Sequence, residues 1–147
     1  MNSVETVSYD GYFTLQWHIT HRCNLRCSHC YQDDYTAYES ADALGNILDQ
    51  YVELLLKKYR FKGYLNITGG EPLTHPALFG ILEEAAKRNI KTAVLTNGTL
   101  IGRREARLLK SCGVYYVQVS LDGTEKVHDS IRGEGSFRRA VSGIRAL

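Results

Sequence analysis

Short apolar runs alternate with longer amphipathic stretches over most of the chain. Apolar side chains occupy every second position across residues 13–19, a period that is typical of a half-buried strand. Three further short runs, at residues 64–67, 91–95 and 114–121, have the length and the apolar content of strands. The pattern therefore predicts four strands spread along the sequence.

Amphipathic stretches between and after these strands predict four helices. Ser40 is a suitable N-cap for the first, whose apolar residues recur at helical spacing to about residue 59. The same spacing predicts helices over residues 76–88 and 103–111, and Ser136 begins a fourth. Strands and helices that alternate in this order form a parallel sheet through right-handed crossovers, so we expect an α/β fold.

Four parallel strands are too few to close a barrel, so we expect a partial (βα)-barrel with parallel strands. Residues 12–147 would form this incomplete core, which stops before a fifth strand, and residues 1–11 would be a lead-in segment. We therefore expect the chain to be the front part of a larger protein or a truncated form. In such folds the loops after the carboxyl ends of the strands open on one face, where active sites collect.

Composition limits the class of protein without identifying it. The 147 residues suit one domain, and 44% apolar residues are enough for a core. The 18 basic and 16 acidic residues give a net charge of +2, so charge favours neither nucleic acid nor a membrane as a partner. No apolar run reaches membrane-spanning length and no apolar signal segment opens the chain, so we expect a cytoplasmic protein.

Three cysteines, Cys23, Cys27 and Cys30, lie close together in the loop after the first predicted strand, with no fourth cysteine nearby. A structural zinc or a fully coordinated iron–sulfur cluster usually has four protein ligands. Three thiolates on such a cluster would leave one iron open to bind another molecule. The spacing therefore indicates a metal centre with a free coordination position.

Two other interpretations of the cysteines are open. A disulfide between two of them conflicts with the odd number in the group and the lack of a secretory signal. Zinc is an alternative with a histidine as fourth ligand: His18, His21 or His29. Cys112 stands before a glycine at a predicted helix end, and we expect it in the core.

Together with the residues Gly-Gly-Glu-Pro at 69–72, the Cys-x3-Cys-x2-Cys spacing resembles the radical S-adenosylmethionine (SAM) enzymes. The later segments 119–123 and 128–133 resemble the subgroup with a SPASM or twitch extension, which includes peptide and sulfatase maturases. The resemblance implies that Cys23, Cys27 and Cys30 bind a [4Fe-4S] cluster whose remaining iron holds the amino and carboxylate groups of SAM.

The resemblance also implies a reaction and its participants. Reductive cleavage of SAM would yield a 5′-deoxyadenosyl radical, which abstracts hydrogen from a substrate, here a peptide in preference to a small molecule. An electron donor such as a flavodoxin or ferredoxin would be needed. In such enzymes the cofactor supplies the difficult chemistry, and the protein orients it.

Further site residues follow from the resemblance and each has a structural alternative. His29 stands where relatives place an aromatic residue against adenine, or it is a solvated loop histidine. Gly69 and Gly70 would let the backbone approach the methionyl amino group, since no Cβ intervenes. Glu71 would bind that ammonium group, or it caps the local turn.

The later strands supply three more candidates for contact with SAM. Asn97 is a ligand or a turn residue, and Ser120 would place a hydroxyl near the ribose or carboxylate of SAM. Arg132 matches the arginine that pairs with the SAM carboxylate, because its planar fork can grip a carboxylate at two points. The alternative for Arg132 is a surface ion pair with a nearby carboxylate: Glu125, Asp129 or Glu134. We expect Asp122 to shape its turn.

Two functions compete with a radical SAM core. One is a non-catalytic iron–sulfur or zinc module that transfers electrons or binds a partner. The other is an inactive fragment that binds the cluster and SAM without cleaving it. The sequence offers no residue to assign as hydrogen donor or general base.

Overall fold

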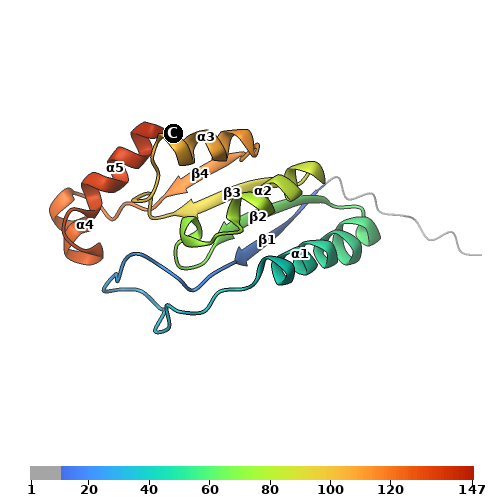
Figure 1. Ribbon diagram of the computed structural model, residues 1–147, viewed down its shortest axis with the longest axis horizontal. Coiled ribbons are helices and arrows are strands. Elements are labelled where there is room, and N and C mark those ends of the chain that lie inside the picture. Colours follow the sequence, from blue (N-terminus) through green and yellow to red (C-terminus); the bar gives the residue numbers. More distant parts are fainter. Residues whose placement is uncertain (1–10) are drawn as a thin grey trace, which may run out of the picture.

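The computed structural model describes residues 11–147, so the predicted lead-in segment lies outside the described residues except for Gly11. The sheet contains four parallel strands in the order β1-β2-β3-β4 (Figure 1). Their bounds are Tyr12–His18 for β1, Lys62–Thr68 for β2, Lys91–Thr96 for β3 and Tyr116–Val119 for β4. The predicted α/β fold with a parallel sheet is confirmed.

Five α-helices accompany the strands within residues 11–147: α1 (Ala41–Gln50), α2 (Leu78–Lys87), α3 (Arg103–Ser111), α4 (Glu125–Arg132) and α5 (Ser136–Ala146). Ser40 is the N-cap of α1, as predicted, and its hydroxyl accepts a hydrogen bond from the backbone N–H of Ala43 at 3.1 Å. No helix in the described part of the chain is both long and apolar enough to cross a membrane.

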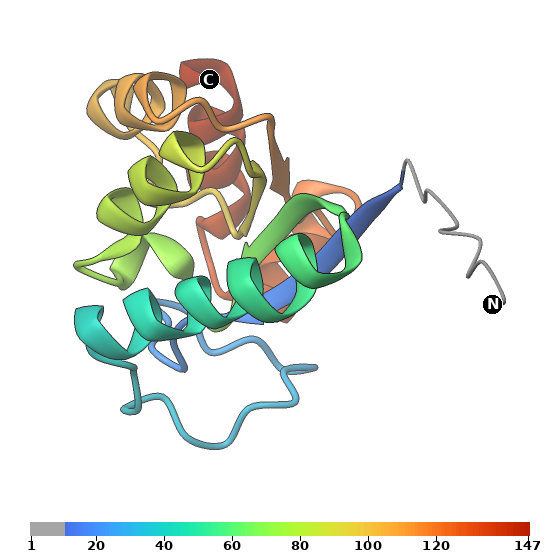
Figure 2. The same ribbon diagram turned by 90° about the vertical axis from the view of Figure 1, so that its right-hand side faces the viewer.

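The main core fills the space between the sheet and helices α1, α2 and α3, which flank it in Figures 1 and 2. Its fully buried side chains come from alternate strand positions and from the apolar stripes of the helices: Leu44, Leu48, Leu65, Ile67, Leu78, Leu82 and Val94. Cys112 is buried in this core, as expected, and its Sγ lies 3.8 Å from the carbonyl oxygen of Phe79. Packing of these apolar faces fixes the strands side by side.

Two predicted elements differ from the structure, and one helix was not predicted. The first helix is α-helical only to Gln50 and continues as a π-helix over Tyr51–Lys57, where successive bonds span five residues. The strand predicted over residues 114–121 is shorter, because only Tyr116–Val119 pairs with β3. Helix α4 was not predicted, since its sequence is mostly polar and buries only His128.

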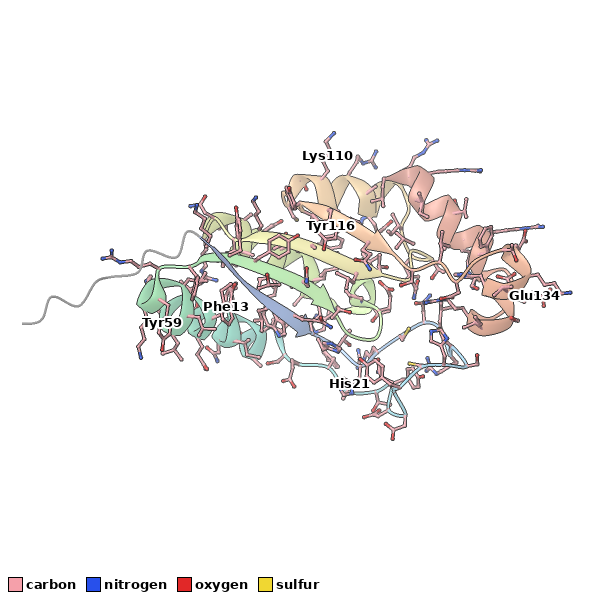
Figure 3. The ribbon with its side chains drawn as sticks, turned by 180° about the vertical axis from the view of Figure 1, so that it is seen from behind. Phe13, His21, Tyr59, Lys110, Tyr116 and Glu134 are labelled. Atoms are coloured by element: carbon pink, nitrogen blue, oxygen red, sulfur yellow. The ribbon has the colours of Figure 1, made fainter. Side chains whose placement is uncertain are left out.

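The strands all point in one direction, so their carboxyl ends meet at a single edge. The loop that contains His21 lies at this edge in Figure 3, and Tyr116 lies toward the opposite end of the sheet. The backbone N–H of Ser28 donates to the carbonyl oxygen of Ile131 at 2.8 Å, which docks this loop on the end of α4. The loops after all four strands lie at this edge and line one cavity, as expected for such a fold.

Candidate functional site

A cavity of about 250 Å³ opens at the carboxyl ends of the strands. It is lined by all the predicted site residues except Glu71: Cys23, Cys27, His29, Cys30, Gly69, Gly70, Asn97, Ser120 and Arg132. These residues come from segments far apart in the sequence, and the parallel topology brings them together. The arrangement places thiols, backbone amides and a cation around one space.

The three cysteines carry free thiols that are partly exposed to this cavity. Cys23 Sγ accepts from the backbone N–H of Leu25, and Cys30 Sγ accepts from that of Gln32, both at 3.4 Å. Burial raises the pKa of the Cys23 thiol and outweighs the Leu25 N–H, which lowers it. Burial also raises the pKa of Cys27, and the nearby positive charge of Arg132 opposes this shift.

Three free thiols on one cavity fit the ligand set of an iron–sulfur cluster with one open iron. A mononuclear zinc needs all its thiolates about 2.3 Å from one point. Within residues 11–147, no three His, Cys, Asp or Glu side chains gather with the geometry that holds one metal ion. The three thiols line one cavity, which the cysteine ligands of a cluster must share.

Gly69 and Gly70 allow a close approach between β2 and the start of the cysteine loop. A Cβ on Gly69 would lie 2.3 Å from the carbonyl oxygen of Thr20, and one on Gly70 would lie 2.3 Å from that of Arg22. The backbone N–H of Gly70 donates to Thr20 and that of Glu71 donates to Arg22, both at 2.8 Å. Because Gly69 and Gly70 have no side chain, the backbone after β2 can form hydrogen bonds with the cysteine loop. Both glycines also line the cavity.

Glu71 lies beneath the cavity wall, and its side chain is fully buried. Its carboxylate accepts from Thr96 Oγ1 at 2.7 Å, from the backbone N–H of Asn97 at 2.8 Å and from that of Leu73 at 3.1 Å. Of the two roles left open by the sequence, this geometry matches the turn cap and not the ammonium ligand. Burial raises the pKa of Glu71 against these three hydrogen bonds, which lower it.

Asn97 shapes a turn, which is one of the two roles that the sequence left open, and its side chain also lies at the cavity. Its Oδ1 accepts from the backbone N–H and the hydroxyl of Thr99, at 2.9 and 2.7 Å, which shapes the turn after β3. Its Nδ2 donates to Asn24 Oδ1 at 2.9 Å and lies 4.0 Å from Cys23 Sγ. Asn24 was not predicted as a site residue, because nothing local to it indicates a contact with the loop after β3.

Arg132 forms its ion pair with Asp122, not with any of the three carboxylates considered from the sequence. Its Nη2 donates to Asp122 Oδ1 at 3.0 Å, and its Nε donates to Oδ2. This pairing lowers the pKa of Asp122 and raises that of Arg132. Asp122 therefore holds the guanidinium at the cavity wall, a role that goes beyond the turn expected for it.

The residues around Arg132 have structural tasks that the motif at 128–133 did not reveal. His128 is fully buried, and its Nδ1 accepts from the backbone N–H of Asp122 at 3.3 Å. The Asp129 carboxylate accepts from the backbone N–H groups of Gly135 and Phe137, each at 2.8 Å, and so caps the start of α5. Both contacts orient α4, which carries Arg132.

His29 and Ser120 line the cavity from two different loops. His29 belongs to the cysteine loop and is exposed. Ser120 follows β4, and its backbone N–H donates to the carbonyl oxygen of Thr96 at 3.0 Å. Both side chains are placed where a bound molecule would contact them.

A profile of the Radical SAM superfamily matches residues 17–147. The antilisterial bacteriocin subtilosin biosynthesis protein AlbA of Bacillus subtilis (strain 168) is 38% identical over 151 residues, covering 97% of this chain and 33% of AlbA. The Fe-coproporphyrin III synthase of Methanosarcina barkeri (strain Fusaro / DSM 804) is 33% identical over 136 residues, covering 87% of this chain and 32% of that protein. The chain spans about a third of the length of these curated relatives.

A solved structure of anSMEcpe with bound AdoMet and Cp18Cys peptide has a similar fold. The TM-score is 0.72 at 24% sequence identity, covering 92% of this chain and 39% of that chain. At this identity the similarity shows the fold alone, a parallel partial barrel. The family match spans the cysteine motif and the loops that converge with it, so the resemblance inferred from the motifs is confirmed: the chain belongs to the radical SAM superfamily.

Proposed function

We propose that this chain is the core of a radical SAM enzyme, in which Cys23, Cys27 and Cys30 hold a [4Fe-4S] cluster. The observation that carries the proposal is the convergence of these three free thiols with the other predicted site residues on one cavity. When bound, the cluster supplies the electron that cleaves SAM to methionine and a 5′-deoxyadenosyl radical, which abstracts hydrogen from the substrate.

The residues of the cavity divide the binding of SAM among them. Asp122 accepts from Nε and Nη2 of Arg132, and the remaining N–H groups of this guanidinium bind the SAM carboxylate. The exposed backbone of Gly69 and Gly70 receives the methionyl amino group. His29 stacks on the adenine, and Ser120 binds the ribose or the carboxylate.

Glu71 has a supporting role in this proposal. Its three donors occupy both carboxylate oxygens, so it joins the turns after β2 and β3 and does not reach SAM. The buried carboxylate thereby fixes the distance between two walls of the cavity. The backbone N–H of Asn97 donates to Glu71, and its side chain lines the cavity beside Cys23.

We infer that the substrate is a peptide. AlbA, named for the biosynthesis of a bacteriocin, is 38% identical to this chain, and a structural neighbour was solved with a peptide. The Fe-coproporphyrin III synthase, at 33% identity, makes a tetrapyrrole the competing substrate class. An electron donor such as a flavodoxin or ferredoxin would reduce the cluster.

The test is production of 5′-deoxyadenosine by protein reconstituted with iron and sulfide in the absence of oxygen. Dithionite and SAM are added, and the product is measured by liquid chromatography and mass spectrometry. We expect product from the wild type and from Cys112→Ala, whose cysteine is in the core, and none from Cys27→Ala. If the wild-type protein binds the cluster but does not cleave SAM, the chain binds the cofactors without the proposed activity.

A further inference from the structure

A closed ring of hydrogen bonds joins the cysteine loop to the turn after β3. Asn97 Nδ2 donates to Asn24 Oδ1 at 2.9 Å, and Asn24 Nδ2 donates to Thr99 Oγ1 at 2.8 Å. Thr99 Oγ1 donates in turn to Asn97 Oδ1 at 2.7 Å. The side-chain amide of Asn24 and that of Asn97 each form one hydrogen bond in the ring through the oxygen and one through the nitrogen. These bonds oppose rotation of either amide.

The ring decides which end of the Asn97 amide faces the cysteines. The backbone N–H of Thr99 can only donate, and it points at Asn97 Oδ1 from 2.9 Å. The oxygen must therefore lie on the Thr99 side, and Nδ2 lies on the side of Cys23, 4.0 Å from Sγ. Since Nδ2 carries two hydrogens, one bonds Asn24 and the second is available to the sulfur.

Asn97 is itself fixed from below. Its backbone N–H donates to the buried carboxylate of Glu71 at 2.8 Å, and the residue is only 7% exposed. Asn24 lies directly after Cys23 in the sequence, so the ring also limits the movement of this cysteine. The positions of both the donor, Asn97 Nδ2, and the acceptor, Cys23 Sγ, are therefore restrained by the ring.

We propose that Asn24 and Asn97 form an amide clamp that positions Cys23 and donates a hydrogen bond to its sulfur, which raises the reduction potential of the bound cluster. The inference rests on the proposed function, because it requires a cluster on Cys23. A hydrogen bond to a ligating sulfur stabilises the added electron of the reduced cluster, and such bonds help to set cluster potentials. Asn97 is the donor, and Asn24 is a positioning residue that acts through it.

The test is the midpoint potential of the reconstituted cluster, measured without SAM by titration followed with electron paramagnetic resonance. We expect a more negative potential in Asn97→Ala than in the wild type, and a shift in the same direction in Asn24→Ala. Asn97→Asp keeps the acceptor for Thr99 but replaces the donor by a carboxylate oxygen, so its potential should be the most negative of the three.

The double variant Asn24→Ala/Asn97→Ala distinguishes a clamp from two independent effects. Because Asn24 acts through Asn97, we expect the double variant to have the potential of Asn97→Ala alone. Thr74→Val is the matched control, since it removes the hydroxyl bonds to Glu71 and Arg22 at the base of the same loop without touching the ring. Its potential should equal that of the wild type.

The outcomes separate this inference from the proposed function. Loaded Asn24 and Asn97 variants with wild-type potentials would overturn the clamp and leave the radical SAM core unaffected. Failure of both alanine variants to retain iron, while Thr74→Val retains it at the wild-type level, supports the positioning of Cys23. A wild-type protein that binds no cluster would overturn the proposed function, and the clamp with it.

Discussion

Arg132 and Asp122 form a two-point ion pair at the edge of the cavity, with the guanidinium of one aligned on the carboxylate of the other. Asp122 follows β4, and Arg132 is the last residue of α4. The pair therefore joins the end of the sheet to a helix and leaves the cation beside the cysteine loop. A second carboxylate that enters the cavity meets an arginine that is already oriented.

Replacing Arg132 should weaken the binding of SAM. Loss of a charged hydrogen-bond donor costs about 1.5–3 kcal/mol, so Arg132→Ala should raise the dissociation constant roughly tenfold to a hundredfold. Equilibrium dialysis of SAM against reconstituted protein measures this, and the cluster absorbance should not change. Arg138→Ala, which removes an exposed pair with Glu125, is the control. An unchanged affinity of Arg132→Ala for SAM would show that Arg132 does not bind SAM.

Glu71→Gln should destabilise the fold. The substitution places an amide N–H₂ where one carboxylate oxygen now accepts hydrogen bonds, so a buried donor of Leu73, Thr96 or Asn97 loses its acceptor. A buried group left without a partner costs about 1–3 kcal/mol. Urea unfolding of the metal-free, reduced protein measures the loss. Equal midpoints for wild type and variant would mean that the carboxylate does not join these turns.

The same carboxylate predicts a dependence of stability on pH. The pKa of Glu71 is raised in the folded protein above its ordinary value of 4.5, chiefly by burial. The unfolded chain thus loses this proton before the folded chain does, so the stability contributed by Glu71 falls as pH rises above about 4.5. The free energy of unfolding of the wild type minus that of Glu71→Gln should decrease over this range. If this difference in unfolding free energy rose with pH instead, the pKa of Glu71 would be lowered, not raised, by folding.

Gly70→Ala should loosen the anchor of the cysteine loop. The added Cβ would lie 2.3 Å from the carbonyl oxygen of Arg22, so backbone must move, at a cost of about 1–3 kcal/mol. Gly45→Ala is the matched control, because no atom beyond the backbone of α1 and the neighbouring residues lies within 4 Å of its added Cβ. This substitution should stabilise by about 0.5–1 kcal/mol. Thermal unfolding compares them, and similar melting temperatures would contradict the close approach.

The parts of the fold with a strong apolar period were predictable. β1 and α2 bury regular sets of side chains, and the parallel order of the strands predicted that the cysteines and Ser120 lie at the same edge. Arg132 was named only through the family resemblance. Helix α4 was not predictable in this way, because it buries a histidine and uses capping and ion pairs in place of an apolar stripe.

Contacts between loops also could not be predicted from the sequence. The burial of Glu71, the choice of Asp122 as the partner of Arg132, and the ring between Asn24 and Asn97 all depend on the distance between segments. Nothing in the local sequence encodes such distances. Nine of the residues that line the cavity could be named from the sequence. The other lining residues, and those that hold the site in place, could not: Tyr31, Gln32, Thr68, Leu95, Thr96 and Gln118 line the cavity without having been named.

The most direct test of the radical SAM assignment is electron paramagnetic resonance of the reduced protein, prepared without oxygen, before and after addition of SAM. We expect the signal of a [4Fe-4S] cluster that changes when SAM is added and is missing from Cys27→Ala. A cluster signal that SAM leaves unchanged, or a protein that binds one zinc and no sulfide, would contradict the assignment.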